Sequence, residues 1–329
     1  MKEKISVIIP CYNSENSIKT VAENVLNTLE KSFECQLILV NDCSKDNVWD
    51  VITGLCAEHQ NIIGLSLARN FGQQSARMAA IEYVTGDYVV FMDDDGQHNA
   101  ADILKLIEKL KTGYDIVYAY FRHKKESGFR VWGSNINRWM TDWVMGTPKN
   151  VHTSSFFVTR RFVVDKLKDY PNPSPYIFGY FMHITRNIAD VAVEHHERIY
   201  GRSGYTLRKL IGLWLEGFTG FSVIPLRIAS IVGCGMAVIG FLGGIYTVIH
   251  KLVEPAVAAG YTSLIAVMLF CCGMIMIMLG LLGEYVGRIF MNLNHLPQYV
   301  VRNKLNVPPN KRVLENQLSE ENEYVREYQ

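Results

Sequence analysis

Short apolar runs alternate with longer amphipathic stretches through the first 121 residues of the chain. The runs lie at 5–10, 36–40, 62–67, 88–92 and 115–121. Nearly continuous apolar residues are typical of strands that are buried on both faces of a sheet. Between the runs, apolar residues return at three- and four-residue steps, as at Ile18, Val21 and Val25, and predict helices. This alternation predicts βαβ units with right-handed crossovers, and hence an α/β fold with a mostly parallel, Rossmann-like sheet.

The second half of the chain has a different pattern. A strand at 155–159, a helix near 177–189 and a strand at 191–198 are expected first, followed by an amphipathic helix at 206–219. Residues 228–249 and 263–283 are almost entirely apolar. Each run is long enough to cross a bilayer, which takes about 20 residues. The alternative is a pair of buried core helices.

Polar residues follow the expected strands repeatedly. They are Tyr12 and Asn13, Asp42, Arg69 and Asn70, Asp93 to Asp95, and Arg122. Ligands of open α/β sheets bind beyond the carboxyl ends of the strands, so these residues predict a site at one sheet edge. Three adjacent carboxylates repel one another unless a cation lies among them, and hard oxygen ligands suit Mg²⁺ or Mn²⁺. An acidic turn that caps the helix beginning near Ala100 is the alternative.

A basic and aromatic segment occupies residues 122–150, where arginines and lysines alternate with Phe129, Trp132, Trp139 and Trp143. This mixture suits the membrane interface, where tryptophan rings lie at the headgroups and cations meet phosphates. An amphipathic helix packed on the sheet would have the same composition. The helix at 206–219 likewise has two interpretations: it lies either in the interface plane or in a buried position.

The charge distribution bears on partners and topology. Lys+Arg is 33 and Asp+Glu is 32, so no basic field favours nucleic acid as a partner. The loop 250–261 carries one lysine and one glutamate, whereas the opposite flanks are rich in arginine and lysine. The positive-inside rule therefore places the N-terminal domain and both termini in the cytoplasm, at the inner (plasma) membrane. We expect no signal peptide, and the seven cysteines have no paired spacing, which indicates a reducing compartment.

Four motifs in fixed order support a family resemblance. They are IIPCYN at 8–13, VNDCSKD at 40–46, ARNFG at 68–72 and DDDGQH at 93–98. In this order they resemble the family 2 glycosyltransferases with a GT-A fold. ERIYGRSGY at 197–205 and FSVIPLR at 221–227 narrow the resemblance to the polyprenyl-phosphate branch, similar to GtrB-type bactoprenol glucosyltransferases and dolichol-phosphate mannose synthase. The similarity runs from about residue 4 to 290.

The resemblance implies roles for individual residues. It implies a nucleotide site made by Pro10, Tyr12, Asn13, Asp42, Arg69 and Asp93. Asp95 and Gln97 would hold Mg²⁺ or Mn²⁺, and Asp94 would fill a variable position. The acceptor phosphate would be held by Arg122, Arg130, Arg198, Arg202 and Ser203, with Asp93, Asp95, Arg122 and Arg198 as the catalytic set. From the residues alone, the alternative for Asp42 is a charge that favours a helix N-terminus, and the alternative for Arg69 and Asn70 is a loop salt bridge.

The implied reaction transfers a hexose or modified sugar from a UDP-linked donor to undecaprenyl phosphate, with inversion, for modification of a cell-envelope glycan. A phosphate monoester has a second pKa near 6, so it needs a general base less than a sugar hydroxyl does. Two other functions stay open: a processive polysaccharide synthase, and a catalytically silent protein that binds nucleotide sugars. Glycines at 233, 235, 240, 243 and 244 permit close helix contacts in a homo-oligomer and are equally tolerated in a monomer.

The sequence departs from the family pattern near residue 152. Members carry Asp-x-Ser-Gly-Phe-Arg-Leu where this chain has HTSSFFV at 152–158, so His152 replaces an aspartate and Phe157 an arginine. His152 is either a substitute polar group or a structural histidine. We expect a GT-A domain at 1–205 and an interfacial helix at 206–227. Membrane helices at 228–249 and 263–283 and a juxtamembrane helix with a polar cytoplasmic tail at 284–329 complete the expected organisation.

Overall fold

The computed structural model of the protein describes residues 2–121, 151–170, 172–173, 175–194, 224–253, 260–294 and 296–307. These residues belong to two compact units. The first contains the sheet described below, and the second contains two long helices. Each unit is described by itself.

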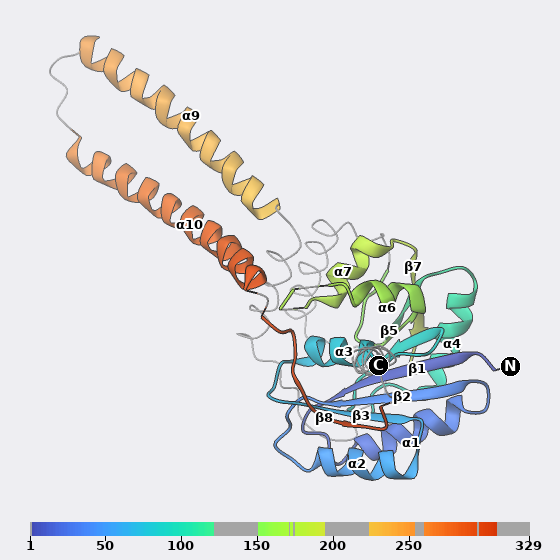
Figure 1. The fold of residues 1–329 in the computed structure, drawn as a ribbon. Coiled ribbons are helices and arrows are strands. Elements are labelled where there is room, and N and C mark those ends of the chain that lie inside the picture. Colours follow the sequence, from blue (N-terminus) through green and yellow to red (C-terminus); the bar gives the residue numbers. More distant parts are fainter. Residues whose placement is uncertain are drawn as a thin grey trace, which may run out of the picture. The chain divides into compact units, whose positions relative to one another are not determined.

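The first unit is built on an eight-stranded mixed sheet in the order β7-β5-β6-β4-β1-β2-β3-β8, counting the described residues (Figure 1). The strands are β1 Lys4–Cys11, β2 Glu34–Asn41, β3 Ile62–Leu67, β4 Tyr88–Phe91, β5 Ile116–Phe121, β6 Phe157–Arg160, β7 Ile188–Val193 and β8 Val301–Leu305. β1 pairs in parallel with β2 and β4, β2 with β3, and β5 with β7. The carboxyl ends of β1 to β5 therefore lie at one edge, as the alternating pattern predicts.

Helices cover both faces of this sheet. They are α1 Ile18–Leu29, α2 Val48–Glu58, α3 Gln73–Ile81, α4 Ala100–Lys111, α6 Arg161–Leu167 and α7 Ile177–Ile184. The apolar stripes of α1, α2 and α4 pack with one face of the sheet in a single core cluster. Helices α3 and α6 contact each other and strands of the same sheet, and α7 contacts α6. The strands are buried on both sides, which explains their nearly continuous apolar sequences.

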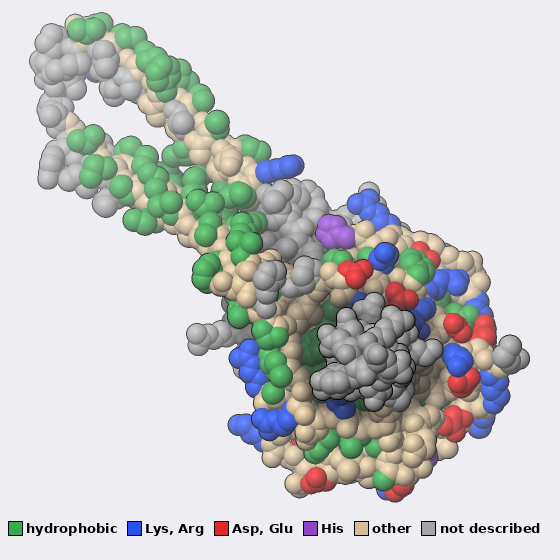
Figure 2. Space-filling model, in the orientation of Figure 1, with side chains coloured by type: hydrophobic (Ala, Val, Ile, Leu, Met, Phe, Trp, Pro, Cys, Tyr) green, Lys and Arg blue, Asp and Glu red, His purple; other side chains and the backbone are tan. Residues whose placement is uncertain are grey.

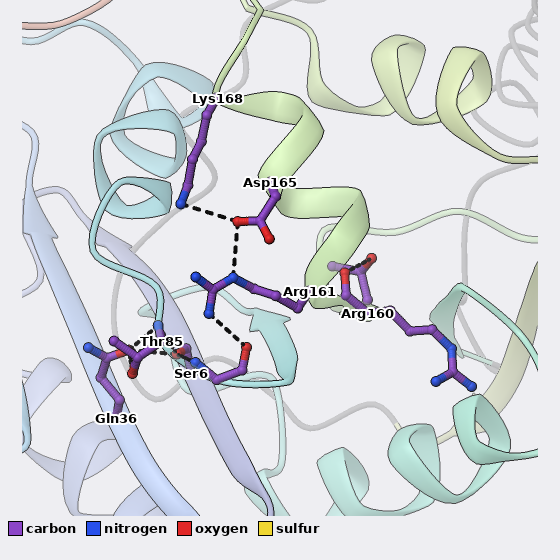
Figure 3. A network of polar contacts seen from close by, with 9 residues as sticks. Ser6, Gln36, Thr85, Arg160, Arg161, Asp165 and Lys168 are labelled. Atoms are coloured by element: carbon purple, nitrogen blue, oxygen red, sulfur yellow. Dashed lines mark hydrogen bonds and ion pairs between the residues drawn. The ribbon is translucent and has the colours of Figure 1, made fainter.

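A polar network holds the sheet together at the opposite end of β4 (Figure 3). The Ser6 hydroxyl donates to the Gln36 side chain at 2.6 Å and accepts from the Gly86 amide at 2.9 Å. The Thr85 hydroxyl donates to the same Gln36 oxygen at 3.0 Å, and Arg161 from α6 reaches the Gly86 carbonyl. A Cβ atom at Gly86 would lie 2.4 Å from the Ser6 nitrogen, so the turn entering β4 requires glycine.

Two strands differ from the expected parallel arrangement. β6 lies between β4 and β5 and runs antiparallel to both. β8 pairs antiparallel with β3, so residues 301–305, part of the expected polar tail, return to the sheet and extend it. The helix expected near 177–189 ends at Ile184, because Thr185 is extended and β7 begins at Ile188.

The second unit contains α9 Ile224–Val253 and α10 Tyr261–Leu293. Hydrophobic side chains are exposed along both helices (Figure 2). Within the described residues, one helical segment, Phe270–Leu293, is long and apolar enough to cross a bilayer, and Ala229–Gly243 is a shorter apolar segment. The expectation of two membrane helices at 228–249 and 263–283 is therefore not confirmed, and α10 extends past the expected limits at both ends. The expected interfacial helix at 206–227 lies mainly outside the described residues.

Candidate active site

Asp42 organises the loop that follows β3. Its carboxylate accepts the backbone N–H groups of Phe71 and Gly72, both at 2.8 Å, and the residue is 3% exposed. Burial raises the pKa of the Asp42 carboxyl, and the two amide donors offset part of that effect. Gly72 has φ 90° and precedes α3, so Asp42 lies at a helix N-terminus, where a negative charge is favourable. In this structure Asp42 orders loop 68–72.

Asp93 lies at the centre of the densest polar network at the sheet edge. It accepts hydrogen bonds from Gln73 Nε2 at 2.5 Å, Arg77 Nη2 at 3.0 Å and Ser155 Oγ at 2.6 Å. The Arg77 side chain is only 4% exposed, and its Nη2 also donates to the Ser155 carbonyl at 3.0 Å. Burial alone would raise the pKa of Asp93, but Arg77, His98 and the hydrogen bonds outweigh it and hold the pKa below its ordinary value. Asp93 is therefore a carboxylate fixed in one orientation.

Asp94 ties the end of β4 to the end of β1. Its Oδ2 accepts the Tyr12 backbone N–H at 3.0 Å. Burial raises the pKa of Asp94 to about 6, and the neighbouring Asp93 charge acts in the same direction. The family resemblance gives Asp94 only a variable position, whereas this contact gives it a definite structural one. Asn13, which has φ 53°, continues the link. Its side-chain oxygen Oδ1 accepts the backbone N–H of Lys45 at 2.9 Å.

Asp95 and Gln97 lie on the half-exposed turn before α4. The Gln97 backbone N–H donates to Asp95 Oδ1 at 3.1 Å, which brings the two residues together. Asn99 caps α4 by accepting from the Ala101 N–H, so the alternative of an acidic helix cap is wrong. The described residues hold no group of three or more His, Cys, Asp or Glu side chains that would bind a metal alone. One carboxylate and one amide oxygen fit a Mg²⁺ or Mn²⁺ site completed by water and phosphate oxygens.

The structure locates the other predicted residues as follows. Pro10 is buried within β1, opposite Val40 of β2, whereas Tyr12 is 47% exposed beyond the strand end. The Arg69 guanidinium lies 4.5 Å from the centre of the Phe71 ring, a cation–π contact in place of the loop salt bridge considered above. The predicted acceptor-phosphate residues lie outside the described residues, as does the whole basic and aromatic segment 122–150; they are Arg122, Arg130, Arg198, Arg202 and Ser203.

Three residues around Asp93 were not anticipated from the sequence: Gln73, Arg77 and Ser155. Arg77 and Gln73 are on α3, whose residues 75–81 are all buried, so a charged side chain in this stretch was the available signal. The Arg77 guanidinium lies 5.9 Å from the ring centres of both Phe91 and Phe157. A cation from α3 thus approaches the position where the family pattern carries an arginine on β6.

Comparisons with known proteins identify the family of the chain. Residues 6–169 match the domain "Glycosyl transferase family 2", and residues 224–289 match the "GtrB C-terminal hairpin". The chain is 33% identical over 315 residues to the undecaprenyl-phosphate 4-deoxy-4-formamido-L-arabinose transferase of Proteus mirabilis, covering 94% of this chain and 96% of that protein. It is 32% identical to the bactoprenol glucosyl transferase of Shigella phage SfV, covering 92% and 99%.

A solved structure resembles the fold. Glucosyl-3-phosphoglycerate synthase from Mycobacterium tuberculosis, crystallised with Mn²⁺, UDP-glucose and phosphoglyceric acid, superposes with a TM-score of 0.50 at 18% identity. The match covers 66% of this chain and 78% of that chain.

Proposed function

Because this chain belongs to glycosyltransferase family 2, we propose that it transfers a sugar from a nucleoside diphosphate sugar to polyprenyl phosphate at the cytoplasmic face of a membrane. One observation carries the proposal. The similarity to two enzymes named for undecaprenyl phosphate or bactoprenol extends over more than nine-tenths of the chain, including both the sheet domain and the helical hairpin. The donor proposed here is a UDP-linked hexose or modified sugar.

The sheet edge supports a nucleotide and metal site in this reaction. Asp93 is held ionised by Arg77 and fixed by Gln73 and Ser155, as a group that contacts the nucleotide must be. Tyr12, whose backbone N–H donates to Asp94, is exposed and is suited to stack on a base. Asp95 and Gln97 would hold Mg²⁺ or Mn²⁺, which offsets the charge that builds on a departing diphosphate. Arg122, Arg130, Arg198, Arg202 and Ser203 remain the proposed contacts of the acceptor phosphate.

Membrane attachment is part of the proposal. Helices α9 and α10 expose apolar side chains along their length, and together they correspond to the hairpin shared with the family. We propose that both cross the bilayer and that the sheet domain lies on the cytoplasmic side, as the basic flanks favour. A water-soluble donor and a lipid phosphate would then meet at the membrane surface.

The decisive experiment is a donor panel. Membranes containing the protein are incubated with Mg²⁺ or Mn²⁺, undecaprenyl phosphate and UDP-linked sugars, and the lipid extract is analysed by mass spectrometry. We expect one lipid-linked sugar with a single residue added, and its loss in Asp95→Ala. Asp50→Ala, which removes an exposed carboxylate on α2, is the matched control and should remain active. A growing polymer would favour a processive synthase, and unchanged transfer by Asp95→Ala would refute metal-assisted catalysis here.

A further inference from the structure

His152 contacts two residues that are distant in the sequence, Asp190 and Tyr120. Its ring Nδ1 lies 2.7 Å from Asp190 Oδ2, and its backbone N–H donates to the same oxygen at 2.7 Å. The imidazole stacks on Tyr120, with ring centres 3.9 Å apart and planes inclined by 27°. The His152 side chain is still 35% exposed. The His152 imidazole therefore has a fixed orientation and is accessible on one side.

The partners determine which nitrogen remains for another molecule. An ionised carboxylate only accepts, so Nδ1 carries the proton of the His152–Asp190 bond. The other ring nitrogen, Nε2, lies on the far side of the imidazole from Nδ1. In the neutral ring Nε2 accepts a proton, and in the imidazolium it donates one.

Strand register places this pair near Asp93. Phe91 of β4 and Tyr118 of β5 both pair with Phe157 of β6. Two residues further on, Asp93 and Tyr120 are therefore at the same level and on the same face of the sheet. One strand lies between theirs, so their backbones are roughly 10 Å apart at a spacing of about 4.8 Å per strand. A sugar can lie between Asp93 and the imidazole stacked on Tyr120.

We propose that His152 binds the acceptor phosphate through Nε2 and removes its remaining proton. This inference rests on the proposed function and identifies the group that handles the acceptor in this chain. With a second pKa near 6, the acceptor phosphate still carries a proton on part of its molecules near neutral pH, and Nε2 of a neutral imidazole can accept that proton. The same contact forms as P–OH with neutral imidazole or as P–O⁻ with imidazolium. His152 thus takes a place that the family pattern gives to an aspartate.

The step balances without a further reactant. The O–H bond of the phosphate monoanion breaks, and its proton moves to His152 Nε2. An electron pair of that phosphate oxygen forms the bond to the anomeric carbon as the bond from this carbon to the diphosphate breaks. The nucleoside diphosphate leaves with the electron pair, and the imidazolium later returns its proton to water.

A purely structural role is the competing explanation. Asp190 also receives the His152 backbone N–H, and Ser155, three residues later, contacts Asp93. His152 would then only anchor the segment that supports Asp93. The two roles differ in their effect on nucleotide binding, which an anchoring defect weakens and an acceptor defect leaves intact.

The test uses the full-length protein in detergent or lipid and compares His152→Ala, His152→Gln and Asp190→Asn with wild type. Thr153→Ala, at an exposed neighbouring position, is the control. UDP binding with Mn²⁺ is measured by calorimetry, and transfer kinetics are measured with undecaprenyl phosphate varied. We expect unchanged UDP binding, kcat/KM for the acceptor lower by about 100-fold in His152→Ala and by about 10-fold in Asp190→Asn. Thr153→Ala should match wild type.

The pH dependence separates proton transfer from simple contact. His152→Gln keeps a polar group but cannot take a proton, so its defect should be larger at pH 6, where about half of the phosphate is a monoanion, than at pH 8, where the phosphate is a dianion. Asp190 and Tyr120 are the titratable side chains that contact the His152 ring within the described residues. A pH-independent defect, equal activity of His152→Ala, or parallel loss of UDP binding would each overturn the proposal. A wild type that forms no lipid-linked sugar would refute the proposed function as well.

Discussion

The buried pair of Arg77 and Asp93 is the contact on which the candidate site most depends. Replacing Arg77 by methionine keeps the length of the side chain and removes its charge. Asp93, 22% exposed on its side chain, would keep its bonds from Gln73 and Ser155 but lose its cation. Leaving one member of a buried ion pair alone costs about 3–5 kcal/mol. The partial exposure of Asp93 favours the lower end, about 3 kcal/mol.

Thermal unfolding of the full-length protein in detergent measures this effect. A loss of about 3 kcal/mol lowers Tm by roughly 6–12 °C in a domain of 150–250 residues. The double variant Arg77→Met/Asp93→Asn should recover part of the loss, because the uncompensated charge is gone. Since the pKa of Asp93 is lowered from 3.8, the pair is fully stabilising above that value and is lost as the pH falls through the folded-state pKa. A shift below 1 °C at pH 7, or strict additivity in the double variant, would refute the reasoning.

Three further predictions concern stability and use the same unfolding assay, with a chelator present. The pKa of Asp94 rises from 3.8 to about 6, so its ionisation destabilises the fold increasingly between these values. Asp94→Asn should therefore stabilise the protein above pH 6, by at most about 3 kcal/mol, and give no gain below pH 4. Gly86→Ala should cost about 3 kcal/mol or more against the backbone of β1, whereas Gly54→Ala, with open space on α2, should stabilise by about 1 kcal/mol. Asn99→Ala should cost about 1 kcal/mol, because α4 loses its cap. Opposite signs for Asp94→Asn or for the two glycine variants would contradict these assignments.

The parallel half of the sheet could be predicted from local pattern alone. Each of β1 to β5 is a short apolar run followed by an amphipathic helix or a polar turn, and right-handed crossovers place consecutive strands in one sheet. The position of the acidic stretch at the carboxyl end of β4 follows from the same reasoning and is confirmed.

The insertion of β6 and the return of β8 could not be predicted in this way. β6 has four residues and pairs with β4, 66 or more residues earlier, through a register that no local pattern encodes. β8 has three consecutive polar, exposed residues between Val301 and Leu305, a composition typical of a polar tail, and only the packing of Leu305 against the core marks it as a strand of the sheet. The positions of β6 and β8 are determined by pairing with strands that are distant in the sequence.

Arg77 illustrates why the contacts around a site are harder to predict than its carboxylates. The motif at 93–98 is contiguous, so its chemistry can be recognised from neighbouring residues. The cation that fixes Asp93 comes from a helix 16 residues earlier, and Ser155 comes from a segment 62 residues later. His152 and Asp190 are likewise 38 residues apart. Such partners become visible only when the sheet order brings their strands together.

The three adjacent carboxylates lie in different physical environments, and this difference explains how they coexist in spite of their mutual repulsion. Asp93 is compensated by a buried guanidinium, so its charge is retained. Asp94 is half-buried and accepts the Tyr12 backbone N–H just beyond β1, and its raised pKa lowers the repulsion near and below pH 6. Asp95 faces the half-exposed turn with Gln97. Because the first charge is neutralised by Arg77 and the second is partly suppressed, a divalent cation at this edge would act mainly on Asp95 and on the phosphates of a bound donor. Replacing Arg77 should consequently affect metal affinity less than replacing Asp95 does.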